Sequence, residues 1–477
     1  MKVLTAAQMR EADRRAIEAG IPGLILMENA AMRVVEVLAE RYAPLDRHHI
    51  VVCCGKGNNG GDGLAIARQL GVRFGVRTDV VLACEPQEFR GDALTNWRML
   101  VMSKCCRVTR DIPHVTTLIV DALLGTGLEG APRGRAAELI EEIKRCSGAK
   151  VVAVDLPSGL GFGGVRADVT VTLGAPKVEH YLSVEAGRAG KLIVGAIGIP
   201  SAFLDEEPSH WLNVTEPKQV AAVLGTRVRD GHKGSYGHVL VVGGAVGKSG
   251  AAAMAGLAAL RAGAGLVTVA CEDTRSMAPE LMTATFEAPP LEGKTVVAAG
   301  PGLGTDARAL ALLRTVLAAD AVKVLDADAL TVAAAEGLSL AGCILTPHPG
   351  EMSRLTELAT AQVQADRLSV ARGFARERAC TVVLKGHRTL IAFPDGEVWI
   401  NPTGNPGMAT GGSGDVLTGL IAGLVAQEPE RWREAVVAAV WLHGCAGDHA
   451  AAELSERCVI ATDLLRFLPR AMADAQL

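Results

Sequence analysis

Short apolar runs alternate with helical stretches along the whole chain. In the first half the runs lie at residues 48–54, 78–84, 116–122, 150–156, 167–173 and 191–197, and helical patterns separate several of them. Runs that are apolar at nearly every position are typical of parallel strands whose sheet is buried on both faces. The alternation therefore predicts a layered α/β fold rather than an all-α or all-β fold.

A polar, proline-bearing stretch at residues 200–219 interrupts this alternation. The pattern then restarts, with apolar runs at 237–244, 265–271, 295–304, 322–330, 343–351 and 380–386 and an alanine-rich helix at 250–262. The two halves carry different glycine motifs, so they are not duplicates. We expect one domain at residues 1–213 and a second at residues 214–477.

Composition narrows the class of protein. The 477 residues are 49% hydrophobic with a net charge of −4, which argues against a nucleic-acid partner or an anionic membrane surface. No uncharged apolar run reaches the roughly 18 residues of a membrane span, and the charged N-terminus lacks the apolar core of a signal peptide. The 11 cysteines show no CxxC spacing, which favours reduced thiols in a cytoplasmic protein over disulfides or zinc.

A glycine-rich segment, GKGNNGGDG at residues 55–63, follows the first predicted strand and opens a helix. Such a turn directs backbone N–H groups at a ligand, although its spacing is not that of the GxGxxG dinucleotide fingerprint. The alternative is a tight structural turn. Asp121 and Asp155 end two further predicted strands. Ligands bind at this end of the strands in α/β sheets, but an Asp in this position can also simply cap the next helix. Oxygen-bearing side chains in these loops suit an alkali or alkaline-earth cation.

The motifs GNNGGDG, DALLGTGL and DLPSGL, in this order, resemble those of the NAD(P)H-hydrate epimerase domain, as does the opening segment 4–30. The resemblance implies a Rossmann-like three-layer α/β/α domain with K⁺ held by Asn59, Asp121 and Ser158. It makes Asp155 a substrate contact and the candidate acid/base. The remaining implied substrate contacts are Asn58, Asn59, Gly60, Gly61, Asp62, Gly125, Thr126, Gly127, Leu128, Glu129, Gly130 and Ala131. The loop after Leu160 is shorter than is usual in the family, and Lys177 also matches the family, with either a functional or a surface role.

The second half contains two glycine-rich motifs. The first only approximates a phosphate-binding P-loop, whereas the second has the features of a catalytic phosphoryl-transfer site. VVGGAVGKSG at residues 241–250 approaches the P-loop pattern, but Val242 stands where the first glycine is required. NPTGNPGMATGGSGD at residues 401–415 is a glycine turn that feeds a helix with Asp415 in its first turn. Backbone N–H groups there can stabilise a transferring phosphoryl group, and Asp415 can take a proton from an attacking hydroxyl. The alternative is an ordinary first-turn acid interacting with the helix dipole.

Other predicted strand-end loops of the second half are GPGLG at 300–304, DADAL at 326–330, TPHPGE at 346–351 and LKGHRT at 384–389. The acids of DADAL either react or cap the next helix. His348 lies between two prolines that stiffen its backbone. Lys385 and Arg388 are candidates to bind phosphate.

These motifs, in this order, resemble the ADP-dependent NAD(P)H-hydrate dehydratase, whose domain has the ribokinase-like α/β fold. The resemblance covers nearly all of the second half; one departure is GKSG at 247–250, where an aromatic residue often precedes the helix. The implied nucleotide contacts are Lys385, Gly386, His387, Arg388, Thr389 and Gly414. The implied contacts to the hydrated nicotinamide are Ala251, Gly302, Gly304, His348 and Asp415.

Together the two resemblances imply a bifunctional repair enzyme. Its first half would interconvert the R and S forms of NADHX and NADPHX, and its second half would dehydrate the S form with ADP or ATP and Mg²⁺. We expect a homo-oligomer that acts on small molecules. Two alternatives remain: a ribokinase-like kinase for a vitamin or sugar, and a first half that binds without catalysing.

Overall fold

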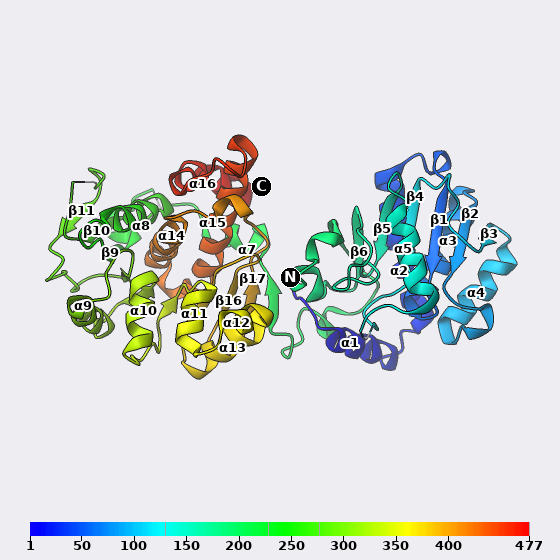
Figure 1. Ribbon diagram of the computed structural model, residues 1–477, viewed down its shortest axis with the longest axis horizontal. Helices are drawn as coiled ribbons and strands as arrows, with labels where there is room; N and C mark the ends of the chain where they lie inside the picture. The colour runs from blue at the N-terminus through cyan, green and yellow to red at the C-terminus, as the bar shows by residue number, and fades with distance from the viewer. Residues whose placement is uncertain (129, 228, 276, 477) are drawn as a thin grey trace. The chain divides into compact units, whose positions relative to one another are not determined.

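The computed structural model describes residues 1–128, 130–227, 229–275 and 277–476. Its contacts divide into two compact units (Figure 1). The N-terminal unit comprises Lys2–His210, and the C-terminal unit comprises Trp211–Leu477 together with Met1. Strand β8 (Leu212–Val214) pairs with β17 (Val398–Ile400). The polar segment before residue 214 therefore carries an edge strand of the C-terminal unit.

The N-terminal unit is built on a parallel sheet with the strand order β3-β2-β1-β4-β5-β6-β7. The strands are β1 (Ile50–Cys54), β2 (Thr78–Leu82), β3 (Cys106–Thr109), β4 (Leu118–Ala122), β5 (Lys150–Val154), β6 (Val169–Leu173) and β7 (Lys191–Gly195). The helices are α1 (Ala6–Glu18), α2 (Gly23–Tyr42), α3 (Asn58–Phe74), α4 (Gly91–Ser103), α5 (Gly134–Arg145) and α6 (Glu179–Leu182). The chain reverses direction across the sheet between β1 and β4, which is where open α/β sheets bind ligands.

Alternate residues of the central strand β1 pack on opposite faces of this sheet. Val52 and Cys54 pack with α2, α3 and α4, whereas Val51 and Cys53 pack with α5 (Figure 1). Because both faces are covered, the strands contain apolar residues at nearly every position. The expected three-layer α/β/α architecture is confirmed.

The C-terminal unit has a larger sheet with the strand order β11-β10-β9-β12-β13-β14-β15-β16-β17-β8. Its other strands are β9 (His238–Val242), β10 (Leu266–Ala270), β11 (Met282–Ala284), β12 (Val296–Ala299), β13 (Val322–Leu325), β14 (Ile344–Leu345), β15 (Thr381–Leu384) and β16 (Leu390–Ala392). Pairing is parallel except where β16 runs antiparallel to β15 and β17. The chain again reverses direction across the sheet between β9 and β12.

Helices cover both faces of this sheet (Figure 1). On one face pack α7 (Pro217–Val223), α8 (Ser249–Ala262), α14 (Ser413–Gln427), α15 (Trp432–Leu454) and α16 (Ala461–Gln476). The remaining helices are α9 (Ala307–Leu317), α10 (Ala327–Ala335), α11 (Pro349–Thr356), α12 (Thr360–Ala365) and α13 (Arg367–Glu377). Within the described ranges, no helix combines the length and apolarity needed to cross a bilayer.

Two glycines let α14 cross α8 at very short range. A Cβ added at Gly419 would lie 2.0 Å from the Ala255 carbonyl oxygen, and one at Gly423 would lie 2.6 Å from that of Ala259. Any larger side chain at these positions would push the helices apart. This close crossing fixes the position of the α14 N-terminus, which carries Asp415.

Candidate active sites

The glycine segment after β1 combines backbone packing with an open helix start. A Cβ at Gly55 would lie 1.8 Å from the Leu123 carbonyl oxygen, and one at Gly60 would lie 1.8 Å from the Gly55 carbonyl oxygen. Gly57 precedes α3, and no side chain caps that helix N-terminus. The glycines therefore let β1, β4 and α3 approach closely and leave the first N–H groups of α3 available to a ligand.

A cavity of about 740 Å³ lies at this edge of the N-terminal sheet. The predicted substrate-binding residues that line it are Asn58, Asn59, Asp62, Gly125, Thr126, Gly127, Leu128 and Asp155. Gly60 and Gly61 instead face the interior, against Gly55 and Met27. Gly130 and Ala131 are exposed further along their loop, and Glu129 lies outside the described residues.

Asp155 is held at the cavity wall by a buried lysine. Its φ of +65° is uncommon for a residue other than glycine, although Asp adopts it more readily than most. The carboxylate forms an ion pair with Lys177, which is 1% exposed. The Lys177 Nζ also donates to the Leu173 carbonyl oxygen at 2.7 Å and to Thr172 Oγ1 at 3.2 Å. The structure therefore excludes the surface role that the sequence left open for Lys177.

His180 holds the backbones of Lys177 and Asp155 in place through hydrogen bonds. Its Nδ1 accepts from the Lys177 N–H at 2.9 Å, so its Nε2–H donates to the Asp155 carbonyl oxygen at 2.8 Å. Burial lowers the pKa of His180 to about 4, with a smaller contribution from Lys177. The ring is therefore neutral near pH 7 and acts as a positioning group.

Two more acids of this cavity have perturbed pKa values. Burial, opposed by Lys177, raises the pKa of Asp13 to about 6. Burial and the neighbouring Asp155 raise the pKa of Asp62 well above its ordinary value. The cavity can therefore offer protonated and ionised carboxyl groups at the same pH. Asp13 carries no sequence signal of its own, because it is one charged residue among several on the amphipathic helix α1.

Of the three predicted K⁺ ligands, Asn59 lines the cavity, whereas Asp121 and Ser158 do not line it, although Ser158 contacts the lining residue Leu124. Asp121 and Ser158 are both fully buried, and Ser158 donates its hydroxyl at 2.6 Å and its N–H at 2.8 Å to the two oxygens of Asp121. Burial raises the pKa of Asp121 to about 6, and among the described residues no Lys, Arg or His forms an ion pair with it. Nearby, the amide nitrogen of Asn59 is buried without a hydrogen-bond partner, and the side chain lies beside Gly125.

The short loop after Leu160 is closed by a glutamate. Glu185 Oε2 accepts from the N–H groups of Gly161 at 2.9 Å and Gly163 at 3.0 Å. Val165 then donates its N–H to the Ser158 carbonyl oxygen at 2.9 Å. This departure from the usual family sequence therefore leaves Ser158 and Asp155 firmly placed.

In the C-terminal unit, the glycine turn places Asp415 at the start of α14. Gly412 has a φ of +92° and precedes the helix without any side-chain cap. His443, neutral because burial lowers its pKa to about 4, contacts the Ser413 carbonyl oxygen at 2.9 Å and so supports the turn. Burial and the nearby Asp326 raise the pKa of Asp415 to about 6, although Lys385 opposes the shift.

Asp326 organises the polar groups around this helix start. It precedes α10 but makes no side-chain cap. Instead it accepts from Lys385 Nζ at 2.7 Å and from Thr418 Oγ1 at 2.8 Å. A Cβ at Gly414 would lie 3.3 Å from Lys385 Nζ. The lysine therefore lies against the glycine turn, and a side chain at position 414 would crowd its ammonium group.

The GPGLG loop joins the same site. A Cβ at Gly302 would lie 3.5 Å from the Ala251 Cβ, and the Gly304 N–H donates to Asp328 Oδ2 at 2.8 Å. Asp328 also pairs with Lys248 at 3.0 Å and contributes to the raised pKa of Asp415.

The segment at residues 241–250, whose sequence is close to the P-loop pattern, does not have the backbone arrangement of a P-loop. Gly244 donates its N–H to Pro301, Ala245 to Gly302, and Val246 to the Glu272 carboxylate. Because these N–H groups already bind protein oxygens, they do not form a phosphate cradle.

His348 has a structural task in this structure. Its Nδ1 accepts from the N–H groups of Gly350 and Glu351 at 3.0 and 3.2 Å and so caps α11. Its Nε2 lies 3.4 Å from Glu351, whose other oxygen lies 3.7 Å from Lys385. His348 is half-exposed and linked to the site through Glu351.

Arg367 holds the backbone of the predicted nucleotide-binding loop, residues 385–389, through hydrogen bonds. That arginine donates to the carbonyl oxygens of Leu384 at 3.0 Å and Lys385 at 3.4 Å, and also to that of His387. Thr389 donates its hydroxyl to the Gly386 carbonyl oxygen at 3.1 Å. Arg388 donates from Nη1 to the Pro402 carbonyl oxygen, which holds its guanidinium against the segment that leads into the glycine turn.

Comparison with known families gives a match for each unit. Residues 23–179 match the family model of the YjeF-related protein N-terminus, and residues 239–470 match that of NAD(P)H-hydrate dehydratase. The ADP/ATP-dependent NAD(P)H-hydrate dehydratase of Bacillus subtilis, co-crystallised with ATP and Mg²⁺, is 34% identical with a TM-score of 0.51; the match covers 55% of this chain and 98% of that one. A ribokinase-like superfamily protein of Enterococcus faecalis is 33% identical with a TM-score of 0.50, over 56% and 97%. The ribokinase-like fold of the second half is therefore confirmed.

Curated relatives match over the whole length. The bifunctional NAD(P)H-hydrate repair enzyme of Moorella thermoacetica is 41% identical over 100% of this chain and 97% of that protein. The enzyme of the same name from Coxiella burnetii is 41% identical over 97% of each chain, and that from Escherichia coli is 34% identical over 98% and 93%. These matches confirm the resemblance found in each half. The chain therefore belongs to the family of bifunctional NAD(P)H-hydrate repair enzymes.

Proposed function

We propose that this chain restores hydrated nicotinamide cofactors in two steps. The N-terminal unit interconverts the R and S forms of NADHX and NADPHX, and the C-terminal unit dehydrates the S form to NADH or NADPH using ADP or ATP. One observation carries the proposal: a chain that matches bifunctional repair enzymes over its whole length has a separate carboxylate–lysine centre in each unit. These centres are Asp155–Lys177 and Asp415–Lys385–Asp326.

In the N-terminal unit, Asp155 is the proposed acid/base for epimerisation at C6 of the nicotinamide ring. Lys177, His180 and the positive φ hold its carboxylate at the cavity wall. A positioned acid/base must lie within hydrogen-bond reach of the proton that it moves, and a fixed carboxylate satisfies this without reorganisation. The loops around Asn58 and Thr126 supply the walls that contact the substrate.

Potassium fits the group formed by Asn59, Asp121 and Ser158. These residues offer oxygens, which hard cations prefer, and the buried Asp121 forms no ion pair with a protein cation within the described ranges. A bound K⁺ would supply the missing positive charge and hold the wall of the cavity in place. With one carboxylate and two neutral ligands, the group suits a monovalent ion better than Ca²⁺.

In the C-terminal unit, Asp415 is the proposed base that takes the proton of the S-hydrate hydroxyl. That oxygen then attacks the terminal phosphorus of the nucleotide and displaces AMP from ADP, or ADP from ATP. Loss of the phosphate from C6, together with a proton from C5, forms the double bond and restores the dihydronicotinamide. The open N-terminus of α14 at Ser413–Asp415 offers N–H groups to the transferring phosphoryl group. Ala251, Gly302 and Gly304 are the proposed neighbouring contacts for the nicotinamide, and His348 is a further proposed contact.

Nucleotide and Mg²⁺ are proposed to bind beside this centre, on Lys385–Thr389 and Gly414. The carboxylates of Asp326, Asp328 and Asp415 influence one another, and such an oxygen-rich group fits the hard Mg²⁺ ion that accompanies a nucleotide. Bound Mg²⁺ would offset nucleotide charge. The relative co-crystallised with ATP and Mg²⁺ supports this assignment.

The proposal is tested by adding purified protein, Mg²⁺ and ADP to a mixture of the two NADH hydrate epimers. We expect full recovery of dihydronicotinamide absorbance with release of one phosphate per molecule restored. Accumulation of a phosphorylated product would favour a ribokinase-like kinase. Recovery of only the S fraction would favour an N-terminal unit that binds without catalysing.

The location and the assembly of the protein are also proposals. The structure leaves the eleven cysteines unpaired, which supports a reducing compartment such as the cytoplasm. Homo-oligomerisation stays a prediction that analytical ultracentrifugation would test.

A further inference from the structure

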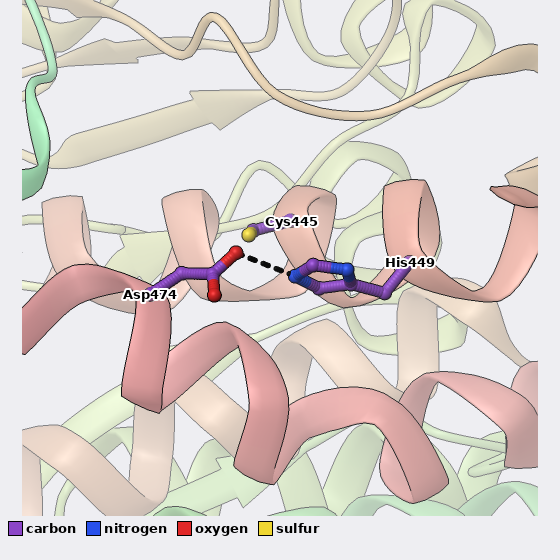
Figure 2. A group of neighbouring side chains, drawn as sticks. All are labelled: Cys445, His449 and Asp474. Atoms are coloured by element: carbon purple, nitrogen blue, oxygen red, sulfur yellow. Dashed lines mark hydrogen bonds and ion pairs between the residues drawn. The ribbon is translucent and has the colours of Figure 1, made fainter. Parts of the chain in front are cut away.

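Helices α15 and α16 bring together a thiol, an imidazole and a carboxylate that the proposed reactions do not use. Cys445 and His449 lie one helical turn apart on α15, and Asp474 faces them from α16 (Figure 2). His449 Nε2 lies 2.7 Å from Asp474 Oδ2. The ligand atoms of all three side chains lie within 4.8 Å of one another.

The Cys445 side chain belongs to the apolar core of the C-terminal unit. Cys445 is only 8% exposed, and in the described part of the chain its sulfur makes no hydrogen bond. Figure 2 shows the sulfur on the same side of α15 as the imidazole and the carboxylate. Burial, reinforced by Asp474 and Asp448, raises the pKa of the thiol to about 12. Without a cation the thiol therefore stays protonated near pH 7.

We propose that Cys445, His449 and Asp474 form a Zn²⁺ site, with a water molecule as the fourth ligand. Sulfur, imidazole nitrogen and carboxylate oxygen are the ligands that zinc takes in proteins, and tetrahedral geometry places them about 3.3–3.6 Å apart. To reach this geometry the 2.7 Å contact between His449 and Asp474 must lengthen, and any separation near the 4.8 Å limit must shorten. Asp474 can move because its side chain is 42% exposed and lies near the end of α16.

The charges of this site balance. Zinc binding releases the thiol proton to solvent and leaves a thiolate and a carboxylate, which together neutralise the ion. Because the ligands come from two helices, the ion would join α15 to α16. Asp448, the neighbour of His449, accepts from the Gly404 N–H and from Asn405 Nδ2, both at 2.9 Å. The proposed zinc site therefore lies on α15, the same helix that binds residues 404–405, which precede the glycine turn before α14.

The test uses the full chain, reduced and stripped of metal, in two titrations. Zn²⁺ is titrated in competition with a chromophoric chelator, and Co²⁺ is titrated while the thiolate-to-cobalt absorption band is recorded. We expect one tightly bound ion per chain, a thiolate band, and a rise in the melting temperature. Cys445→Ser should abolish the band and weaken zinc binding by at least about tenfold. Cys458→Ser, at an exposed cysteine of the same unit, is the matched control and should change neither.

Absence of a thiolate band, or parental zinc affinity in Cys445→Ser, would overturn the proposal. If Cys445→Ser does not fold, Asp474→Asn decides, because this partly exposed position tolerates an amide. An Asp474→Asn variant that binds zinc as tightly as the parent would refute the site.

Discussion

Replacement of Asp415 by Asn separates proton transfer from every other feature of the dehydratase centre. The two side chains are nearly isosteric, and Gly412 and Ser413 still start α14. Lys385 keeps its 2.7 Å contact with Asp326, so no cation is left unpaired. The amide cannot accept the proton, and general-base catalysis is typically worth about 10²–10⁴-fold. We therefore expect kcat for dehydration to fall by about that factor, or about 3–5 kcal/mol of transition-state stabilisation.

Stability should change little in this variant. The lost interaction of Asp415 with the helix dipole is worth about 0.3–1 kcal/mol, and removal of a buried charge beside Asp326 offsets it. Initial rates of NADH recovery from the S-hydrate would be measured with saturating ADP, together with thermal unfolding. The KM for ADP should stay near its parental value. Glu430→Gln, at an exposed carboxylate beyond the same helix, is the control and should be fully active.

The pH profile gives a second readout of the same residue. Because the pKa of Asp415 is raised to about 6, the carboxylate becomes protonated and inactive as pH falls through that value. The parental kcat/KM should therefore decline below about pH 6, and the Asn variant should lack this limb. A variant that dehydrates at nearly the parental rate would show that another group takes the proton and would refute the reasoning.

Three further outcomes are expected. Asp155→Asn, which suits the φ of +65°, should abolish epimerisation and leave S-specific dehydration intact; near-parental interconversion of epimers, followed by chromatography, would make Asp155 a structural residue. Replacing K⁺ with a bulky organic cation should lower both epimerase activity and melting temperature because Asp121 loses its counter-ion, and indifference of both would contradict the assignment. A fragment that begins at residue 211, and so keeps β8, should fold by circular dichroism and dehydrate only the S form; an unfolded fragment would contradict the proposed independence of the units.

The sequence predicted the central strands of both sheets because these are apolar at nearly every position. It missed β3 (Cys106–Thr109), which is polar and half-exposed, and it missed the antiparallel β16 and β17, whose runs span only three residues each. Short edge and hairpin strands obtain their stability from pairing with neighbours, so their own residues carry little signal.

Site residues were predictable from the sequence where they lie within a glycine-rich loop motif. Contacts between residues that are far apart in the sequence were not predictable. Asp155 and Asp415 stand out in their glycine-rich contexts. The sequence could not show that Asp326 contacts Lys385 and Thr418 rather than capping α10, or that Lys177 is buried against Asp155. Asp13 comes from the first helix and reaches the cavity only through tertiary packing.

The central claim is that one chain carries two independent catalytic centres that act one after the other. It is tested most directly by mixing two variants, each of which lacks one centre. Asp155→Asn, Asp415→Asn and their equimolar mixture would each receive both NADH hydrate epimers with Mg²⁺ and ADP, and the extent of NADH recovery would be recorded. We predict that Asp155→Asn restores only the S fraction rapidly, that Asp415→Asn restores almost none, and that the mixture restores both epimers as the parent does. A mixture that recovers no more than Asp155→Asn alone would contradict the account.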